Sequence, residues 1–312
     1  MIDPRDLYEA NFEVSDLLRA RGEGSQVGPV LIISLKGIAD AGHISDAVNQ
    51  HLLDIGEPER VVTFDHDRLV DYHAKRPLLT FDAARWVDYQ GPAIALDLLR
   101  DAEGTQYLLL HGSEPDRYWD AFVQAVVSLV AEFNVSLVLG VAGIPMGVPH
   151  TRPQGAIMHA TREGLIDEDK AWSGSMQVPA TVANVINFVL GLSERDAVGI
   201  AVHVPHYLAQ SQYTPAAIAG LTRVEALSGL DLSVEELAGA AQEAIDEVDR
   251  QASKSQEITD MIRGLENQYD AFMSAHPEES LLAHVTRIPT ADELGEEFEK
   301  FLSRMEKPDT DN

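Results

Sequence analysis

The 312-residue chain contains no cysteine. This absence excludes disulfide bonds, thiol nucleophiles and thiolate metal sites, and it is compatible with a reducing cytosol. Basic residues are also scarce, because 23 Lys and Arg stand against 51 Asp and Glu and leave a net charge of −28. Nucleic acids and anionic membranes are bound mainly through Lys and Arg, so the sequence predicts neither as a partner.

Signals for membrane insertion and for common reactions are missing as well. No apolar run approaches the roughly 18 residues that span a bilayer, and residues 1–6 (MIDPRD) lack the basic flank and apolar stretch of a signal peptide. We therefore expect a cytoplasmic protein. The chain has no G-x-x-x-x-G-K-[ST] phosphate loop, no G-x-S-x-G nucleophile elbow and no H-E-x-x-H zinc motif. The sequence accordingly predicts no cofactor, and no motif in it names a reaction.

Up to residue 212, short apolar runs alternate with amphipathic helical patterns, which is typical of a sheet with helices on both faces. Residues 30–35 (VLIISL) and 135–141 (VSLVLGV) are bounded, β-branched runs that indicate buried strands. We therefore predict an α/β core over residues 1–212, built as a three-layer sandwich around a parallel or mixed sheet. Further strands are expected at 60–64, 93–99, 106–111, 155–161 and 197–204, with a hairpin insertion at 78–89.

From residue 213 onward the pattern is helical and acidic. Residues 231–312 carry 7 basic and 21 acidic side chains, a net charge of −14. Apolar residues spaced three and four apart at 234–248 and 258–272 indicate a helical hairpin. S/T-x-x-E capping boxes begin at Ser233 and Thr290, and the second opens a final helix. We predict that residues 213–312 form an acidic, all-helical C-terminal region.

Polar residues gather in the loops that follow predicted strands, which is where open α/β sheets bind ligands. The richest of these loops follows the strand at 135–141. We predict that the polar residues of several such loops converge at one edge of the sheet and form a ligand or partner rim. The residues of this predicted rim are Asp40, Glu114, His150, Thr151, Arg152, His206 and Tyr207.

Two interpretations of the rim stay open. A hydrogen-bonded structural histidine is commoner than a metal ligand, so we expect no metal site. If zinc did bind, His150, His206 and Glu114 would be its candidate ligands. Arg152 could clamp a carboxylate or phosphate of a ligand, or it could brace neighbouring loops through Asp40 or Glu114. We favour the bracing role.

Other residues near strand ends also have two interpretations. Ser113 could act as a nucleophile, but a role for Ser113 or Glu114 as the cap of a helix beginning at Pro115 is favoured. His159 and His203 are further candidates for acid–base or metal chemistry, with the same structural alternative.

Several segments together resemble one family. Residues 148–153 (VPHTRP) and 204–207 (VPHY) are the most specific, and the others are 37–42 (GIADAG), 108–115 (LLLHGSEP) and 296–302 (EEFEKFL). On these motifs the sequence is identified as a member of the proteasome assembly chaperone 2 family, in its long actinobacterial form. The resemblance extends from about residue 31 to residue 302.

The resemblance implies an α/β core similar to phosphorylase- and hydrolase-type sheets, an appended helical region, and self-association, for instance as a trimer. It implies no catalytic residue. Some relatives are chaperones that bind proteasome core subunits during assembly, and those that dock into the proteasome ring use a C-terminal hydrophobic-Tyr-x tripeptide. Residues 310–312 (TDN) differ from that tripeptide, so the resemblance favours binding through a folded surface.

The sequence therefore predicts a non-enzymatic, homo-oligomeric binding or assembly-chaperone-like protein. The alternative is an enzyme or small-ligand-binding protein that uses the polar residues at the strand ends. Convergence of these residues in a deep pocket would favour the alternative. Burial of the same side chains against one another, with mutual hydrogen bonds, would favour a scaffold.

Overall fold

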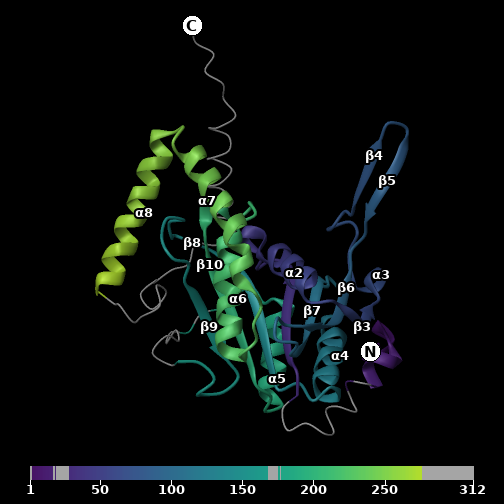
Figure 1. Ribbon diagram of the computed structural model, residues 1–312. Helices are drawn as coiled ribbons and strands as arrows, with labels where there is room; N and C mark the ends of the chain where they lie inside the picture. Colours follow the sequence, from purple (N-terminus) through teal and green to yellow (C-terminus); the bar gives the residue numbers. More distant parts are fainter. Residues whose placement is uncertain (1, 17, 19–27, 168–174, 176, 276–312) are drawn as a thin grey trace.

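A mixed eight-stranded sheet forms the centre of the computed structural model, which describes residues 2–16, 18, 28–167, 175 and 177–275 (Figure 1). The strand order is β1-β3-β6-β7-β2-β8-β10-β9. The four strands β7, β2, β8 and β10 are mutually parallel, and the remaining pairs are antiparallel. The strands are β1 (Tyr8–Ala10), β2 (Val30–Lys36), β3 (Glu59–Phe64), β6 (Ile94–Arg100), β7 (Gln106–Ser113), β8 (Leu137–Met146), β9 (Ala156–Ala160) and β10 (Ala197–Pro205).

Helices cover both faces of this sheet (Figure 1). α4 (Trp119–Glu132) and α5 (Val182–Leu192) pack on one face, and α2 (Ile44–Ile55) and α6 (Thr214–Ser228) pack on the other. The short helix α3 (His66–Leu69) follows β3. The predicted α/β sandwich with a mixed sheet is confirmed.

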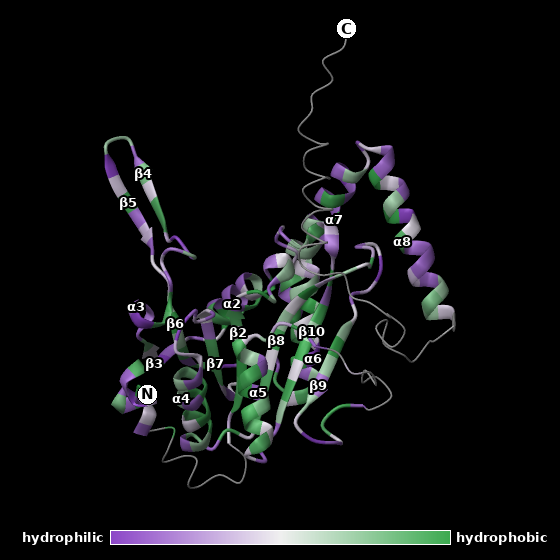
Figure 2. Ribbon diagram, turned by 180° about the vertical axis from the view of Figure 1, so that it is seen from behind, coloured by the Kyte–Doolittle hydropathy of each residue, from purple (hydrophilic) through white to green (hydrophobic). Residues whose placement is uncertain are grey.

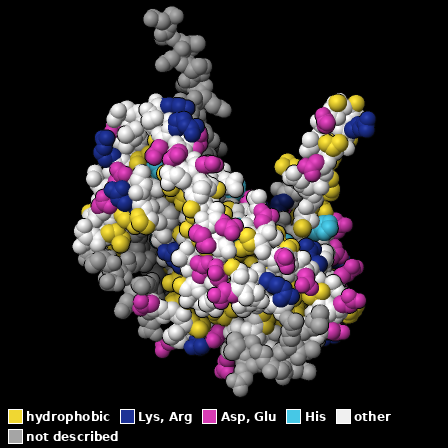
Figure 3. Space-filling view, viewed as in Figure 1, with side chains coloured by type: hydrophobic (Ala, Val, Ile, Leu, Met, Phe, Trp, Pro, Cys, Tyr) yellow, Lys and Arg dark blue, Asp and Glu magenta, His cyan; other side chains and the backbone are white. Residues whose placement is uncertain are grey.

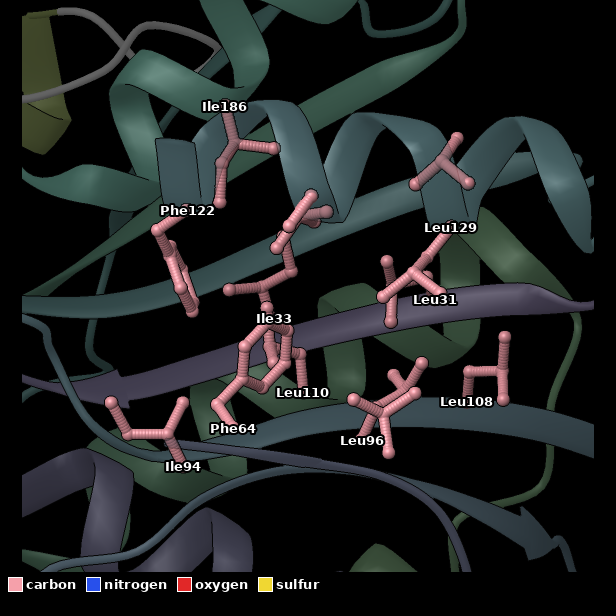
Figure 4. Close-up of a cluster of buried hydrophobic side chains, with 14 of the residues drawn as sticks. Leu31, Ile33, Phe64, Ile94, Leu96, Leu108, Leu110, Phe122, Leu129 and Ile186 are labelled. Carbon is pink, nitrogen blue, oxygen red and sulfur yellow. The ribbon is translucent and has the colours of Figure 1, made fainter. Parts of the chain in front are cut away.

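The two cores arise because successive strand residues point to opposite faces. Leu31 and Ile33 of β2 face α4 and α5, whereas Ile32 between them faces α2 and α6. Figure 4 shows the first cluster, in which the rings of Phe64 and Phe122 lie 4.8 Å apart. Each fully buried side chain of this size contributes about 1.5–3 kcal/mol relative to its exposed state. Continuous apolar strands such as β2 are therefore stable only when both faces are covered.

A helical hairpin follows α6 and extends beyond the ends of the strands (Figure 1). A 3-10 turn (Val234–Leu237) leads into α7 (Ala238–Ala252), and α8 (Gln256–Ala275) runs back toward the sheet. We call α7 and α8 the helical arm. The boundary at residue 212 stays a prediction, and α6, which follows that boundary, packs on the sheet. The final helix expected from Thr290 lies outside the described residues.

A second projection is the predicted two-stranded hairpin of β4 (Leu78–Asp82) and β5 (Arg85–Gln90). The structure shows that it stands away from the body (Figure 1). Among the described residues, no helix has both the length and the apolar composition needed to cross a bilayer.

Two expected helix caps are wrong. The helix expected at Pro115 begins only at Trp119. Instead of capping it, Glu114 accepts hydrogen bonds from the backbone N–H of Val182, at the start of α5, and of Ile38. Ser233 has a left-handed backbone and makes no side-chain cap bond, because a 3-10 turn precedes α7 there.

Candidate functional site

The C-terminal ends of the four parallel strands β7, β2, β8 and β10 lie at one edge of the sheet, which we call the rim. The loop of residues 147–155 leaves this edge after β8 and leads into β9; we call it the rim loop. The turn after β2 crosses β8 nearby, where Asp40 forms a bridge with Gly143. A Cβ at Gly143 would lie 2.2 Å from the carbonyl oxygen of Ala41, so this close crossing requires glycine.

Asp40 is buried in this turn and accepts hydrogen bonds from the first turn of α2. Its two carboxylate oxygens accept hydrogen bonds from the backbone N–H and the hydroxyl of Ser45, both at 2.8 Å. Burial raises the pKa of Asp40 above its ordinary value, although the bonds from Ser45 act in the opposite direction. Asp40 therefore stabilises the turn locally.

His150 lies at the centre of the rim and joins the core to the helical arm. Its backbone N–H donates to the Tyr207 hydroxyl at 2.9 Å, and its Nδ1 lies 2.7 Å from the same oxygen. Its Nε2 lies 3.0 Å from a carboxylate oxygen of Asp249 on α7. Because a carboxylate only accepts, Nε2 carries the proton, and Nδ1 accepts from the Tyr207 hydroxyl. Burial raises the pKa of Tyr207, which keeps this hydroxyl protonated.

Arg152 binds α8 in a bidentate ion pair. Its Nε and Nη2 donate to the two carboxylate oxygens of Asp270, at 2.8 and 2.7 Å. Glu266, one helical turn earlier, accepts from the Thr151 hydroxyl at 2.6 Å and lies 3.4 Å from Nη1 of Arg152. The hydrogen bonds from Arg152 hold the pKa of Asp270 below its ordinary value, and the bond to Asp270 raises that of Arg152.

An apolar contact accompanies these polar ones. The Tyr269 hydroxyl donates to the carbonyl oxygen of Pro153 at 3.1 Å. The side chain of Tyr269 packs against Met146 and Val148, which are buried at the end of β8 and in the rim loop. The helical arm is therefore docked on the rim loop through ion pairs, hydrogen bonds and a small apolar cluster.

The structure brings together five of the seven predicted rim residues. The rings of His206 and His150 each meet that of Tyr207 edge to face, with centroids 5.4 and 5.9 Å away. Asp40 and Glu114 lie at other points of the edge, where each holds a backbone turn. The expectation that Arg152 braces the loops through Asp40 or Glu114 is wrong, because its carboxylate partners come from α8.

The carboxylates that complete the cluster are Asp249, Glu266 and Asp270, and sequence reasoning missed them. The last two are four residues apart and so share one helix face, which was the available signal. Within the described residues, no group of three or more His, Asp or Glu side chains could hold a metal ion. A small cavity in the described part of the chain lies elsewhere, in the apolar core beside Leu31 and Phe64.

His203 lies on β10 and is buried, and its backbone N–H donates to the carbonyl oxygen of Gly155 in the rim loop, whereas His159 lies on the edge strand β9 and is exposed. His203 is 1% exposed, and neither ring nitrogen has a hydrogen-bond partner. Burial, reinforced by the positive charge of Arg223, lowers the pKa of His203 to about 4. Desolvation by its neighbours also lowers the pKa of His159, although this residue is exposed on β9. The imidazole of His203 is therefore an uncharged part of the protein interior near neutral pH.

We compared the chain with protein-family models and with solved structures, and both comparisons found similar proteins. The model of the PAC2 family matches residues 34–252. A Mycobacterium tuberculosis protein of unknown function has a similar structure, with a TM-score of 0.80, 37% identity, and coverage of 87% of this chain and 93% of its own. A Corynebacterium glutamicum protein of unknown function gives a TM-score of 0.78 with 28% identity, covering 86% and 99%.

A third solved structure, a proteasome-assembly chaperone homologue of Mycobacterium tuberculosis, shares the fold. It has a TM-score of 0.67 and 23% identity over 75% of this chain and 99% of its own. No curated protein matches the chain.

We predict that Arg152→Lys loosens the helical arm, because lysine cannot make the bidentate contact with Asp270. Backbone amides of α8 should exchange hydrogen about fivefold faster than in the parent protein, as expected when an exposed ion pair is lost. Mass-spectrometric hydrogen exchange measures this directly. Arg263→Lys is the matched control, because Arg263 pairs with Asp260 inside α8 and not with the rim loop. Equal exchange in all three proteins would contradict the assigned contact.

We predict that His203 makes the protein less stable in mild acid. The unfolded chain takes up a proton near pH 6.5 and the folded chain only near pH 4. The contribution of His203 to the free energy of unfolding is therefore fully present above pH 6.5 and is lost as the pH drops toward 4. Between pH 7 and pH 5 this loss amounts to about 2 kcal/mol. Urea unfolding should show a smaller loss over this interval for His203→Leu, and an unchanged loss would refute the assignment.

Proposed function

This chain belongs to the PAC2 family, and from that premise we propose that it is a non-enzymatic, homo-oligomeric binding protein of the assembly-chaperone type. Its partners would be proteins. The family match covers most of the α/β core and α7, and a structural relative is described as a proteasome-assembly chaperone homologue. The exposed apolar hairpin of β4 and β5 is the observation that carries the proposal.

The hairpin projects large apolar side chains into solvent. Leu78 is 69% and Trp86 is 65% exposed, and Phe81 and Tyr89 are also more than half exposed. Figure 3 shows hydrophobic side chains along the projecting hairpin. An isolated two-stranded hairpin is at best marginally stable in water, and soluble monomers rarely expose extended apolar patches. The hairpin therefore has the composition of a contact element.

A second copy of the chain is the occupant that we assign to the hairpin. Because the hairpin stands away from its own body, its apolar side chains have to be covered by another molecule. An arm that binds the body of the next copy makes a head-to-tail contact, and such contacts form a closed ring when the rotation between copies closes and an open filament when it does not. A trimer is the smallest ring of this kind. This geometry supports the self-association that the sequence predicts.

The rim gives less support to the enzymatic alternative. The side chains of His150 and Arg152 are engaged by carboxylates of the same chain, and Thr151 donates to one of them. An active site needs groups that can reach a substrate within hydrogen-bond distance. The contacts of these residues favour a scaffold that positions the helical arm.

We predict that the double variant Phe81→Ser/Trp86→Ser lowers the mass of the particle to that of one chain. Both side chains are exposed, so the melting temperature should change little. Light scattering after size exclusion measures the mass. Phe12→Ser is the control, because Phe12 is also largely exposed but lies outside the hairpin. If the parent protein has the mass of one chain, or if the variant keeps the mass of the parent, the hairpin does not bind a second copy.

We predict that the parent protein binds purified proteasome core α-type subunits and increases their yield of assembled rings. Co-elution and native electrophoresis measure the two effects, with bovine serum albumin as an unrelated control. Assembly at the control rate, together with no co-elution, would count against the chaperone role even if the chain self-associates. The hairpin variant distinguishes the two properties, because it tests self-association separately.

A further inference from the structure

Helix α5 lacks charge throughout its length. Its sequence, VANVINFVLGL, contains no Asp, Glu, Lys or Arg, and Figure 2 shows it as largely hydrophobic. Surface helices normally carry polar residues on the face that points to solvent, whereas a helix that is apolar on all sides is buried. α5 therefore has the composition of a buried helix at a position where one face is open.

The open face of α5 carries large apolar side chains. Phe188 is 66% and Leu192 is 71% exposed, one turn apart, and Val178 just before the helix is also more than half exposed. Helix α4 packs beside α5 on the same face of the sheet and provides a comparison. Apart from the small Ala131, the exposed residues of α4 are polar: Asp120, Gln124, Ser128 and Glu132. The apolar outer face is thus a property of α5 and not of this side of the protein.

The neighbouring strand has a related property. β9 is the last strand of the described sheet, and its sequence, AIMHA, has no Lys, Arg, Asp, Glu or Pro. Edge strands are commonly protected from pairing with other chains by charged residues or proline. Asn184 on α5 contacts His159 on β9, so the two uncharged elements form a continuous surface.

We propose that the outer face of α5 binds the same face of a second copy of this chain across a two-fold axis. Two copies that each carry a net charge of −28 repel one another, so a contact between them has to avoid carboxylates. The α5 face meets this condition. A two-fold axis places identical patches against each other, and an uncharged apolar patch is complementary to itself.

The size of the patch indicates how far the contact extends. A stable interface buries roughly 800 Å² per partner, which is more than Val178, Phe188 and Leu192 can supply. The proposed contact therefore includes the adjoining uncharged edge strand β9. The proposal rests on the self-association proposed above, but it adds a second interface that is separate from the hairpin. A two-fold contact combined with a ring of hairpin contacts would give an assembly larger than the ring.

The absence of cysteine makes a covalent test direct, because any disulfide must join engineered residues. Asn184→Cys, Phe188→Cys and Leu192→Cys are made singly on the outer face of α5. A disulfide forms only where the Cα atoms approach within about 7 Å, so a variant crosslinks efficiently when its own position lies close to the axis. Gln124→Cys and Ser128→Cys on α4 are matched controls on the same side of the protein.

After mild oxidation of dilute protein, at least one α5 variant should give at least ten times more covalent dimer than both controls on non-reducing gels. Yields at the control level for all three α5 variants would overturn the proposal. Crosslinking should persist when Phe81→Ser/Trp86→Ser is added. Its loss in that background would overturn the claim of a separate interface, whereas a failed hairpin assignment leaves the crosslink unaffected.

Discussion

The ion pair between Arg152 and Asp270 is the interaction on which the organisation of the rim depends. The helical arm is rich in carboxylates and belongs to a strongly acidic chain, so contact between the arm and the body is disfavoured except where the body presents donors. The rim loop presents them together, through Arg152, Thr151 and His150. A planar guanidinium fixes both the position and the direction of α8, because its two parallel bonds match one carboxylate. The partially buried Tyr269 adds an apolar contact between α8 and the rim loop.

Much of the fold could be predicted from the sequence, because strands that are buried on both faces have to be continuous apolar runs. β2 was found in this way, whereas the exposed hairpin of β4 and β5 was predicted from two short strand-like runs on either side of residues 82–84. The rim could be predicted in outline, since parallel strands end at the same edge. The partner of Arg152 could not, because 118 residues separate it from Asp270 and no local pattern encodes that distance. Glu114 shows the same limit: a carboxylate before a helix suggests a cap, but its partner is the first residue of a different helix.

Two surfaces depart from the polar exterior that an acidic chain of this kind otherwise has. The β4–β5 hairpin projects apolar side chains on a thin extension, while α5 presents them on a flat, rigid face. These shapes suit different contacts. A projecting hairpin can pack along the side of a neighbouring molecule, whereas a flat face packs against another flat face. The rim is different from both, because the side chains of His150, Thr151 and Arg152 are hydrogen-bonded within the chain. The structure therefore favours contacts with other proteins at the hairpin and at α5, where apolar side chains are exposed. It favours them least at the rim, where the side chains already have hydrogen-bond partners.

The docked arm also sets the concentration that a dissolved anion must reach before it can bind Arg152 in place of Asp270. A carboxylate held on the same chain acts at an effective concentration in roughly the millimolar range, and the tether is a short helical hairpin. A dissolved carboxylate or phosphate must exceed that level, or bind more tightly than Asp270, before it can displace the arm. A dilute anion is thus a weak competitor for the guanidinium, and a ligand that contacts additional parts of the rim would compete more effectively.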